Sequence, residues 1–354
     1  MAGGVGSRFW PMSRTNYPKQ FLDVLGTGKT LLQQTFDRFL KLCPIEHIYI
    51  VTNADYKHLV ETQLPGLPVE NILLEPSRKN TAPCIAYASY KIAQKCPDAV
   101  TVVAPSDHLI LNETGFVNAI QSCFEKASTE NCLMTLGITP TRPDTGYGYI
   151  QFMEVNANEQ DPLIRRVKTF TEKPDLEMAI SLLESGDFLW NSGIFIWSVP
   201  AILKAFMDYA PALSKLFEDG LPYFVEGKEE EAIKLIYNSC KNISIDYAVM
   251  EKAENVFVRI ADIGWSDLGT WGSLYDHVKK DEAGNAVVGK NVMIYDSTNC
   301  IVNVPKDKLV VLQGLNDYIV VESDGILLVC KKSDEQQIRV FVNDVKVTKG
   351  DKYT

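Results

Sequence analysis

The sequence predicts an α/β protein with an open mixed sheet, followed by a small all-β domain. Up to about residue 138, short β-branched segments alternate with longer segments of helical spacing. From Gly284 onward, valine and isoleucine dominate and turn residues recur. We therefore divide the chain into a large α/β domain at 1–283, which is long enough to hold a catalytic site, and a small β domain at 284–354.

The elements follow from periodicity along the chain. In the first half we expect strands at 47–51, 72–74, 99–104 and 132–138, and helices at 28–42, 55–63, 81–95 and 116–127. In the middle we expect strands at 147–153, 165–170 and 190–197, and helices near 175–185, 199–218 and 228–238. The continuous apolar run at 99–104 is typical of a strand buried on both faces, so helices should cover the sheet on both sides.

Composition excludes several classes of protein. The chain has 354 residues, 46% of them hydrophobic, and a formal net charge of −10 without a basic tract, which argues against a nucleic-acid surface. We find no apolar run of membrane length and no signal peptide. The eight cysteines form no CxxC pair, so we expect reduced thiols in a cytoplasmic protein. Neither a zinc spacing of histidines nor a serine nucleophile is recognisable.

The first nineteen residues carry the strongest functional signal. Gly3, Gly4 and Gly6 let a backbone approach a polyphosphate closely, and Arg8 and Lys19 add a guanidinium fork and a point charge. The spacing is neither a Walker A motif nor Gly-x-Gly-x-x-Gly. The glycines alone are equally typical of an ordinary turn. The added cations favour a nucleotide site.

A phosphate loop of this type should follow a buried strand, yet it starts at the first residues of the sequence. We expect an apolar strand on the amino side of Met1. The alternative is that the fold tolerates its absence.

Three acidic residues are candidates for binding the nucleotide and its metal. Asp107 ends the 99–104 strand, and Asp267 lies between Trp265 and Trp271. Each could bind Mg²⁺, although each could also cap or turn the chain. Glu75 could accept the adjacent N1–H and N2 amine of guanine, or it could be a surface residue before a turn.

Four residues further along are candidates for sugar-phosphate binding. Gly148 lies among aromatic residues, where the alternative is a β-bulge. Glu172 and Lys173 could bind hydroxyls and phosphate, or they could be an exposed ion pair. Asn191 places an amide within a buried strand, where it needs a partner.

These motifs resemble one family. Gly4–Arg8 reads Gly-x-Gly-x-Arg, and with Ser13-Arg14 and Pro18–Phe21 the chain resembles the sugar-1-phosphate nucleotidylyltransferases, in the guanylyltransferase branch that acts on mannose 1-phosphate. The resemblance spans almost the whole chain. In this family Arg usually precedes Asn-Thr-Ala-Pro. Here Lys79 takes that place and Arg78 precedes it, which leaves open which cation meets the nucleotide.

The resemblance implies a Rossmann-like, GT-A-like nucleotidyltransferase sheet and a short left-handed β-helix. It implies that Arg8 and Lys19 are catalytic and that Asn80 and Thr81, with the three glycines and Glu75, bind nucleotide. Asp107 and Asp267 would share one Mg²⁺. The reaction would convert GTP and α-D-mannose 1-phosphate to GDP-mannose and pyrophosphate. We expect a homodimer, no nucleic acid or membrane partner, and the transferase alone, without the isomerase domain of longer relatives.

Two rival hypotheses remain. The same chemistry could serve another sugar 1-phosphate, such as a heptose or glucose. A non-catalytic relative could bind nucleotide sugars for regulation, but such proteins usually lose the loop cations or a metal-binding aspartate, and all four residues are present here.

Overall fold

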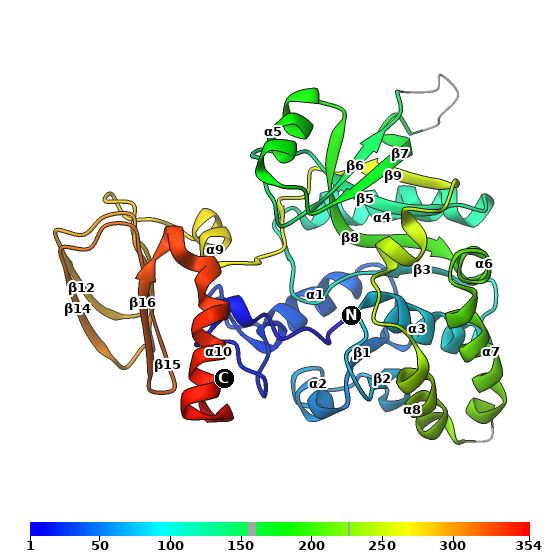
Figure 1. The fold of residues 1–354 in the computed structure, drawn as a ribbon, viewed down its shortest axis with the longest axis horizontal. Coiled ribbons are helices and arrows are strands. Elements are labelled where there is room, and N and C mark those ends of the chain that lie inside the picture. Colours follow the sequence, from blue (N-terminus) through cyan, green and yellow to red (C-terminus); the bar gives the residue numbers. More distant parts are fainter. Residues whose placement is uncertain (155–160, 226) are drawn as a thin grey trace.

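The computed structural model describes residues 1–154, 161–225 and 227–354. Figure 1 shows a larger sheet-and-helix body and a smaller β-rich body beside it, with helix α10 (Ile338–Lys349) running between them. Among the described residues, no helix is both long and apolar enough to cross a membrane.

The main sheet is mixed, as the sequence predicted. Its strands run in the order β3-β8-β5-β9-β7-β6, and β8 also pairs with β6. Their bounds are β3 (Val100–Val103), β5 (Leu133–Ile138), β6 (Gly148–Phe152), β7 (Ile164–Glu172), β8 (Phe188–Ser198) and β9 (Val256–Ile260). The long strand β8 lies antiparallel between β3 and β5, which explains why these two strands are not neighbours.

Two short strand pairs outside this sheet come from the segments before the β-rich region. Strands β1 (Ile50–Asn53) and β2 (Ile72–Glu75) form a separate parallel pair. Strands β4 (Leu109–Ile110) and β10 (Trp265–Ser266) pair antiparallel, and this pairing joins the segment that follows β3 to the segment that carries Asp267.

Helices cover both faces of the main sheet. The helices that precede the β-rich region are α1 (Leu31–Phe39), α2 (Lys57–Gln63), α3 (Thr81–Lys95), α4 (Glu113–Thr129), α5 (Leu176–Ser185), α6 (Val199–Tyr209), α7 (Pro211–Val225), α8 (Glu229–Ser239) and α9 (Trp271–His277). One core packs α3, α6, α7 and α8 against the sheet, around Trp197 and Phe217. A second core packs α4 against the other face, around Phe116 and Ile196.

Local sequence signals explain where several helices begin. Thr30 caps α1 through a capping box with Gln33. Asn80 caps α3 by accepting a hydrogen bond from the backbone N–H of Thr81. The expected helix over 199–218 is instead two helices, because the chain breaks at Ala210 and Pro211 begins α7.

The β-rich region forms two sheets, as in a β-helix, in which the strands pair parallel except for the last strand, β16, which pairs antiparallel with β15. One sheet has the order β11-β13-β15-β16 and the other pairs β12 with β14. The strands are β11 (Ala286–Val288), β12 (Asn291–Tyr295), β13 (Ile301–Asn303), β14 (Leu309–Gln313), β15 (Tyr318–Ser323) and β16 (Ile326–Lys331). The chain then forms α10, a helix that the valine-rich pattern did not reveal, and a short 3-10 helix at Asp351–Tyr353 follows it.

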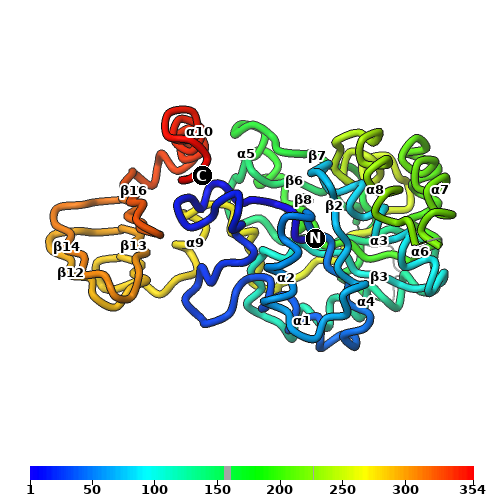
Figure 2. The backbone as a smooth tube through the Cα atoms, turned by 90° about the horizontal axis from the view of Figure 1, so that it is seen from below, coloured from blue at the N-terminus to red at the C-terminus, as the bar shows by residue number. Residues whose placement is uncertain are grey.

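A third core holds the two bodies together. It packs Phe9 and Trp10 of the first loop against Trp271 of α9, Ile319 of β15 and Ile338 of α10. Figure 2, seen from below, shows the N-terminal segment lying against both the β-rich body and α10. The segment directly after the glycine-rich loop, at Phe9 and Trp10, therefore packs against residues of both bodies.

Candidate active site

The glycine-rich loop folds back onto Lys19. Gly6 has φ +68°, and a Cβ atom on it would lie 2.5 Å from Cβ of Lys19. The backbone N–H of Lys19 donates to the carbonyl of Val5 at 3.1 Å, and the Ser13 hydroxyl donates to the carbonyl of Gly6 at 2.6 Å. Only glycine combines this left-handed conformation with so close an approach.

Lys19 connects two distant parts of the chain. Its Nζ lies 2.8 Å from Oδ2 of Asp107 and donates to the carbonyls of Asp267 at 2.8 Å and Leu268 at 3.1 Å. The side chain of Lys19 is buried. Burial alone would raise the pKa of Asp107, but the charges of Lys19 and His108 outweigh it and hold that pKa below its ordinary value. Asp107 is therefore ionised at neutral pH.

Asp267 is held from two sides. Its Oδ1 accepts hydrogen bonds from the Tyr147 hydroxyl at 2.9 Å and from the backbone N–H of Gly269 at 2.8 Å. Its Oδ2 has no hydrogen-bond donor among the described residues. Arg8 donates from Nη1 to the carbonyl of Gly269 at 3.5 Å, while its buried Nε has no partner in the described part of the chain. The structure thus brings Arg8, Lys19, Asp107 and Asp267 to one place.

The donor set suits a magnesium ion that also binds phosphate. Mg²⁺ usually takes one or two protein carboxylates and fills its other positions with water and substrate oxygens. Asp107 and Asp267 supply two carboxylates, and Lys19 joins the carboxylate of Asp107 to the backbone carbonyl of Asp267. Within residues 1–154, 161–225 and 227–354, no group of three or more His, Cys, Asp or Glu side chains could form an all-protein metal site.

Glu75 lies buried at the end of β2, beside the glycine-rich loop. Its Oε1 accepts a hydrogen bond from the Tyr237 hydroxyl at 2.8 Å, and its Oε2 would lie 3.1 Å from a Cβ atom on Gly3. Burial raises the pKa of Glu75 to about 7, although the bond from Tyr237 and the positive charges of the Met1 amino group and Arg78 lower it. A buried carboxylate with one oxygen facing the loop can accept hydrogen bonds from a base.

Arg78, rather than Lys79, contacts the loop. Its Nε donates to the carbonyl of Gly3 at 3.2 Å, and its Nη2 donates to the Tyr56 hydroxyl. Nearby, the Thr81 hydroxyl accepts a hydrogen bond from the backbone N–H of Ile245 at 2.8 Å. Asn80 is exposed and caps α3. Contact of Asn80 and Thr81 with a nucleotide stays a prediction.

The four sugar-site candidates also gather. A Cβ atom on Gly148 would lie 2.5 Å from Oε2 of Glu172 and 3.5 Å from Cβ of Asn191, so the absence of a side chain lets the Glu172 carboxylate lie against the Gly148 backbone. Glu172 pairs with the neighbouring Lys173. The backbone N–H of Lys173 donates to the carbonyl of Tyr147 at 3.2 Å, which ties this group to the residue that holds Asp267.

Sequence reasoning missed two residues that position these side chains. Asp246 accepts a hydrogen bond from Nδ2 of Asn191 at 2.8 Å. Burial and the nearby carboxylate of Glu172 raise the pKa of Asp246. Tyr237 comes from α8 and reaches Glu75 across 162 residues of sequence. Neither residue belongs to a recognisable motif. The one available signal is that Asp246 is a single acidic residue directly after a loop with polar residues.

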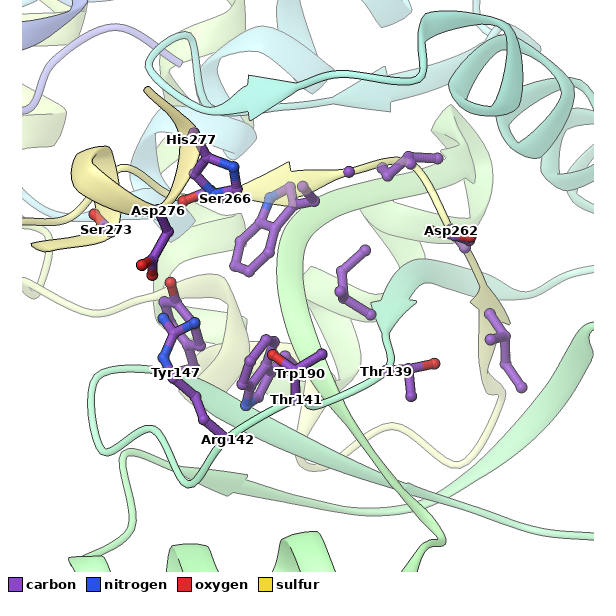
Figure 3. Close-up of a pocket in the computed structure, with 16 residues that line it drawn as sticks. Thr139, Thr141, Arg142, Tyr147, Trp190, Asp262, Ser266, Ser273, Asp276 and His277 are labelled. Atoms are coloured by element: carbon purple, nitrogen blue, oxygen red, sulfur yellow. The ribbon is translucent and has the colours of Figure 1, made fainter. Parts of the chain in front are cut away.

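A pocket of about 630 Å³ adjoins this site. Tyr147, Trp190 and Trp265 line it, and Figure 3 shows Arg142 beside Tyr147, with Asp276 and His277 from α9 across the opening. The pocket shares Tyr147 with the site, but Arg8, Lys19, Asp107 and Glu75 do not line it. The charged groups that suit a triphosphate therefore lie outside this pocket.

Comparisons with known proteins agree with this geometry. Residues 1–284 match the model of the nucleotidyl transferase family, and residues 289–345 match that of the mannoseP isomerase/GMP-like beta-helix domain. A mannose-1-phosphate guanylyltransferase of Klebsiella pneumoniae is 36% identical over 356 residues, which cover 100% of this chain and 74% of the relative. This chain belongs to the mannose-1-phosphate guanylyltransferase family.

Further relatives of this chain extend the comparison. The mannose-1-phosphate guanylyltransferase of Escherichia coli strain K12 is 36% identical over 356 residues, 98% of this chain and 72% of the relative. A solved structure from Thermus thermophilus, described as mannose-1-phosphate geranyltransferase, superimposes with a TM-score of 0.86 at 30% identity and covers 98% of both chains. The expected nucleotidyltransferase fold with a β-helix-like domain is therefore confirmed, and the chain is an enzyme of the nucleotidyltransferase class.

Proposed function

We propose that this chain transfers GMP from GTP to α-D-mannose 1-phosphate, giving GDP-mannose and pyrophosphate. One observation carries the proposal most directly. Lys19 joins the carboxylate of Asp107 to the backbone of Asp267 and Leu268, while Arg8 reaches Gly269, so the separate motifs form one charged site. The names of the relatives supply the substrates.

The reaction needs charge neutralisation more than proton transfer. The phosphate oxygen of the sugar is already a nucleophile. It attacks the α-phosphorus of GTP, a new P–O bond forms, and the bond from the α-phosphorus to the bridging oxygen breaks as pyrophosphate leaves. Arg8 and Lys19 offset the repulsion between the two anions, and Lys173 binds the sugar phosphate. No general base is required.

We assign the remaining candidates to the two ends of the substrate pair. Gly3, Gly4 and Gly6 hold the triphosphate, Glu75 accepts the guanine edge, and Asn80 and Thr81 close the nucleotide end. Gly148, Glu172 and Asn191 bind the mannose ring. Asp107 and Asp267 would hold Mg²⁺, which would supply further positive charge at the phosphates.

We propose a homodimer formed through the β-rich body, in which Met293 and Tyr295 of β12 lie beside Leu309 and Val311 of β14 as an exposed apolar face. No disulfide is formed among the residues that the structure describes, which supports the cytoplasmic location expected from the sequence.

A substrate panel tests this function. The purified chain with Mg²⁺ is given each of the four nucleoside triphosphates and the 1-phosphates of mannose, glucose and a heptose, and pyrophosphate release is followed. We expect GTP with mannose 1-phosphate to have the highest kcat/KM. A decisively higher kcat/KM with another sugar would refute the mannose assignment, and absence of turnover with every pair would favour a non-catalytic relative.

A further inference from the structure

Glu335 of the β-rich body binds to the first turn of helix α9. It lies in the 3-10 helix Lys332–Gln337, which joins β16 to α10. Its Oε2 accepts a hydrogen bond from the backbone N–H of Gly272 at 2.7 Å, across 63 residues of sequence. A Cβ atom on Gly272 would lie 3.0 Å from the same oxygen, so a side chain there would crowd the contact. Figures 1 and 2 show α9 between the two bodies, and this hydrogen bond joins them there.

The N-terminus of α9 leaves a backbone group for Glu335 to satisfy. Thr270 caps the helix, and its side chain accepts from the backbone N–H of Ser273 in a capping box. That motif does not use the N–H of Gly272, the second residue of the helix. The first N–H groups of a helix have no partner within it, and a carboxylate beside them is favourable. Glu335 therefore completes the cap of α9 from the other body of the protein.

The segment Asp267–Gly269 lies directly before the cap of α9. On its amino side, Trp265 and Ser266 are fixed by the pairing of β10 with β4. Within the segment, Leu268 is buried and has φ +45°, a left-handed conformation that costs energy in a residue other than glycine. A residue keeps such a conformation only where its surroundings hold it. The pairing with β4 holds one end of the segment, and Glu335 holds the other end through the cap of α9.

The three carbonyls of the Asp267–Gly269 segment meet the cations of the first loop. Lys19 donates to the first two at 2.8 Å and 3.1 Å, and Arg8 donates to the third at 3.5 Å. The charge of Arg8 also acts on Glu335. Burial raises the pKa of Glu335, while its hydrogen bonds with the cap of α9 and the positive charge of Arg8 lower it. Arg8 is therefore close both to the segment and to the residue that holds it.

We propose that Glu335 is a positioning residue for nucleotidyl transfer, which makes the β-rich body a functional part of the active site. Its hydrogen bond to α9 holds Asp267 and the neighbouring carbonyls in place against Lys19 and Arg8. Glu335 itself contacts neither substrate. A displacement of about 1 Å at catalytic groups can lower a rate by about 10²-fold, so a contact outside the chemistry can control it. The inference rests on the proposed function, because it assigns a role within the same site.

Three variants of the full chain test this role. Glu335→Ala removes the acceptor of the Gly272 N–H, whereas Glu335→Gln keeps an acceptor oxygen of the same reach. Asp334→Ala is the control, because Asp334 is exposed on the same 3-10 helix and accepts from the Ser333 hydroxyl. We expect kcat of Glu335→Ala to fall by about 10-fold, with KM for both substrates within about twofold of wild type. The kcat of the other two variants should stay within about threefold of wild type.

Amide hydrogen exchange gives a readout that does not depend on turnover. The N–H of Gly272 loses its acceptor in Glu335→Ala, and the N–H of Gly269 donates to the carboxylate of Asp267. We expect exchange at both amides to become at least ~10-fold faster in Glu335→Ala. A contact that serves only the cap of α9 would speed exchange at Gly272 and leave Gly269 unchanged.

Three outcomes overturn the proposal. They are unchanged kcat in Glu335→Ala, unchanged exchange at Gly269 in that variant, and an equal loss of kcat in Glu335→Gln. If Glu335→Ala does not yield folded protein, Glu335→Asp, whose carboxylate has a shorter reach, takes its place with the same expectations. Failure of the proposed function is distinguishable, because the wild-type chain would then turn over no substrate pair. Exchange at Gly269 would still decide whether Glu335 holds the Asp267–Gly269 segment.

Discussion

The ammonium group of Lys19 lies 2.8 Å from the carboxylate of Asp107, although 88 residues separate them in the sequence (107 − 19). The same ammonium group donates to the backbone carbonyls of Asp267 and Leu268. A buried lysine that connects three segments has two effects when it is lost. It removes positive charge from the site, and it leaves Asp107 without its charge partner.

Replacing Lys19 with methionine should therefore lower kcat/KM for pyrophosphate release by about 10²- to 10³-fold, the usual effect of losing one electrostatic contact to the transition state. Lys29→Met is the matched control, because Lys29 is an exposed lysine of the same region whose only ion-pair partner among the described residues is Asp37. Its kcat/KM should stay within about twofold of wild type. Equal activity in the two variants would remove Lys19 from the catalytic site.

Glu75 gives a prediction on pH. Its pKa is raised to about 7, so the free enzyme loses the carboxylate as pH falls through 7. If the carboxylate accepts the guanine edge, kcat/KM for GTP falls on the acid side of about pH 7. The Tyr237 hydroxyl lowers this pKa, so Tyr237→Phe should move the fall to higher pH. A profile that is identical in the Tyr237→Phe variant would contradict the coupling.

Selection of the base follows from the same residue. Glu75→Gln keeps the shape of the side chain but replaces one acceptor oxygen with a donor, so guanine loses one of two parallel bonds. We expect the ratio of kcat/KM for GTP over ATP to fall by at least ~10-fold. Glu61→Gln serves as the control, because Glu61 is exposed and, in the part of the chain that the structure describes, pairs with Lys57 alone. An unchanged ratio would mean that another group reads the base.

Asp246 should act on the sugar and not on the nucleotide. It accepts from Nδ2 of Asn191, whose Oδ1 accepts from Gly193 at 3.2 Å, so the amide is held in one orientation. Asp246→Ala should raise KM for mannose 1-phosphate by about 10-fold, equivalent to roughly 1.4 kcal/mol, with KM for GTP unchanged. Asp208→Ala, which removes an exposed partner of Lys204, is the control. Parallel increases in both KM values would indicate a general structural defect.

Gly6 and Gly4 should differ in how much an added Cβ atom destabilises the protein. A Cβ atom at Gly6 would meet Lys19 at 2.5 Å in a left-handed conformation, whereas Gly4 has no atom within 4 Å of such a Cβ. Gly6→Ala should lower the free energy of unfolding by at least ~1–3 kcal/mol, and Gly4→Ala should leave it within ~0.5 kcal/mol. Denaturant unfolding measures both. Equal stabilities would show that the loop adapts without strain.

Local signals were sufficient for much of the fold. The helix α3 begins and ends where the sequence predicts, because Asn80 caps it and its alanine-rich run favours a helix. The helix α10 was missed because its β-branched residues favour strands. Packing overrides that preference, since Ile338 is buried against the core around Phe9 and Trp271 and Val342 packs against the same core.

The sequence predicted those residues of the candidate site that belong to motifs, and it did not predict the others. Arg8, Lys19, Asp107 and Asp267 stand in recognisable motifs, and the structure brings them together. Tyr237 and Asp246 reach the site only through the packing of α8 and of the loop after it, which leaves no local pattern. The choice between Arg78 and Lys79 likewise required coordinates. The two side chains point in different directions, and the order of residues in the sequence does not specify which of them faces the loop.

A crystal structure with GDP-mannose and Mg²⁺ tests the central claim most directly. We predict guanine on Glu75, the diphosphate between the glycine-rich loop and Lys173, the metal between Asp107 and Asp267, and the mannose ring beside Glu172 and Asn191. A nucleotide bound instead in the pocket of Tyr147, Trp190 and His277, away from Lys19, would contradict the account.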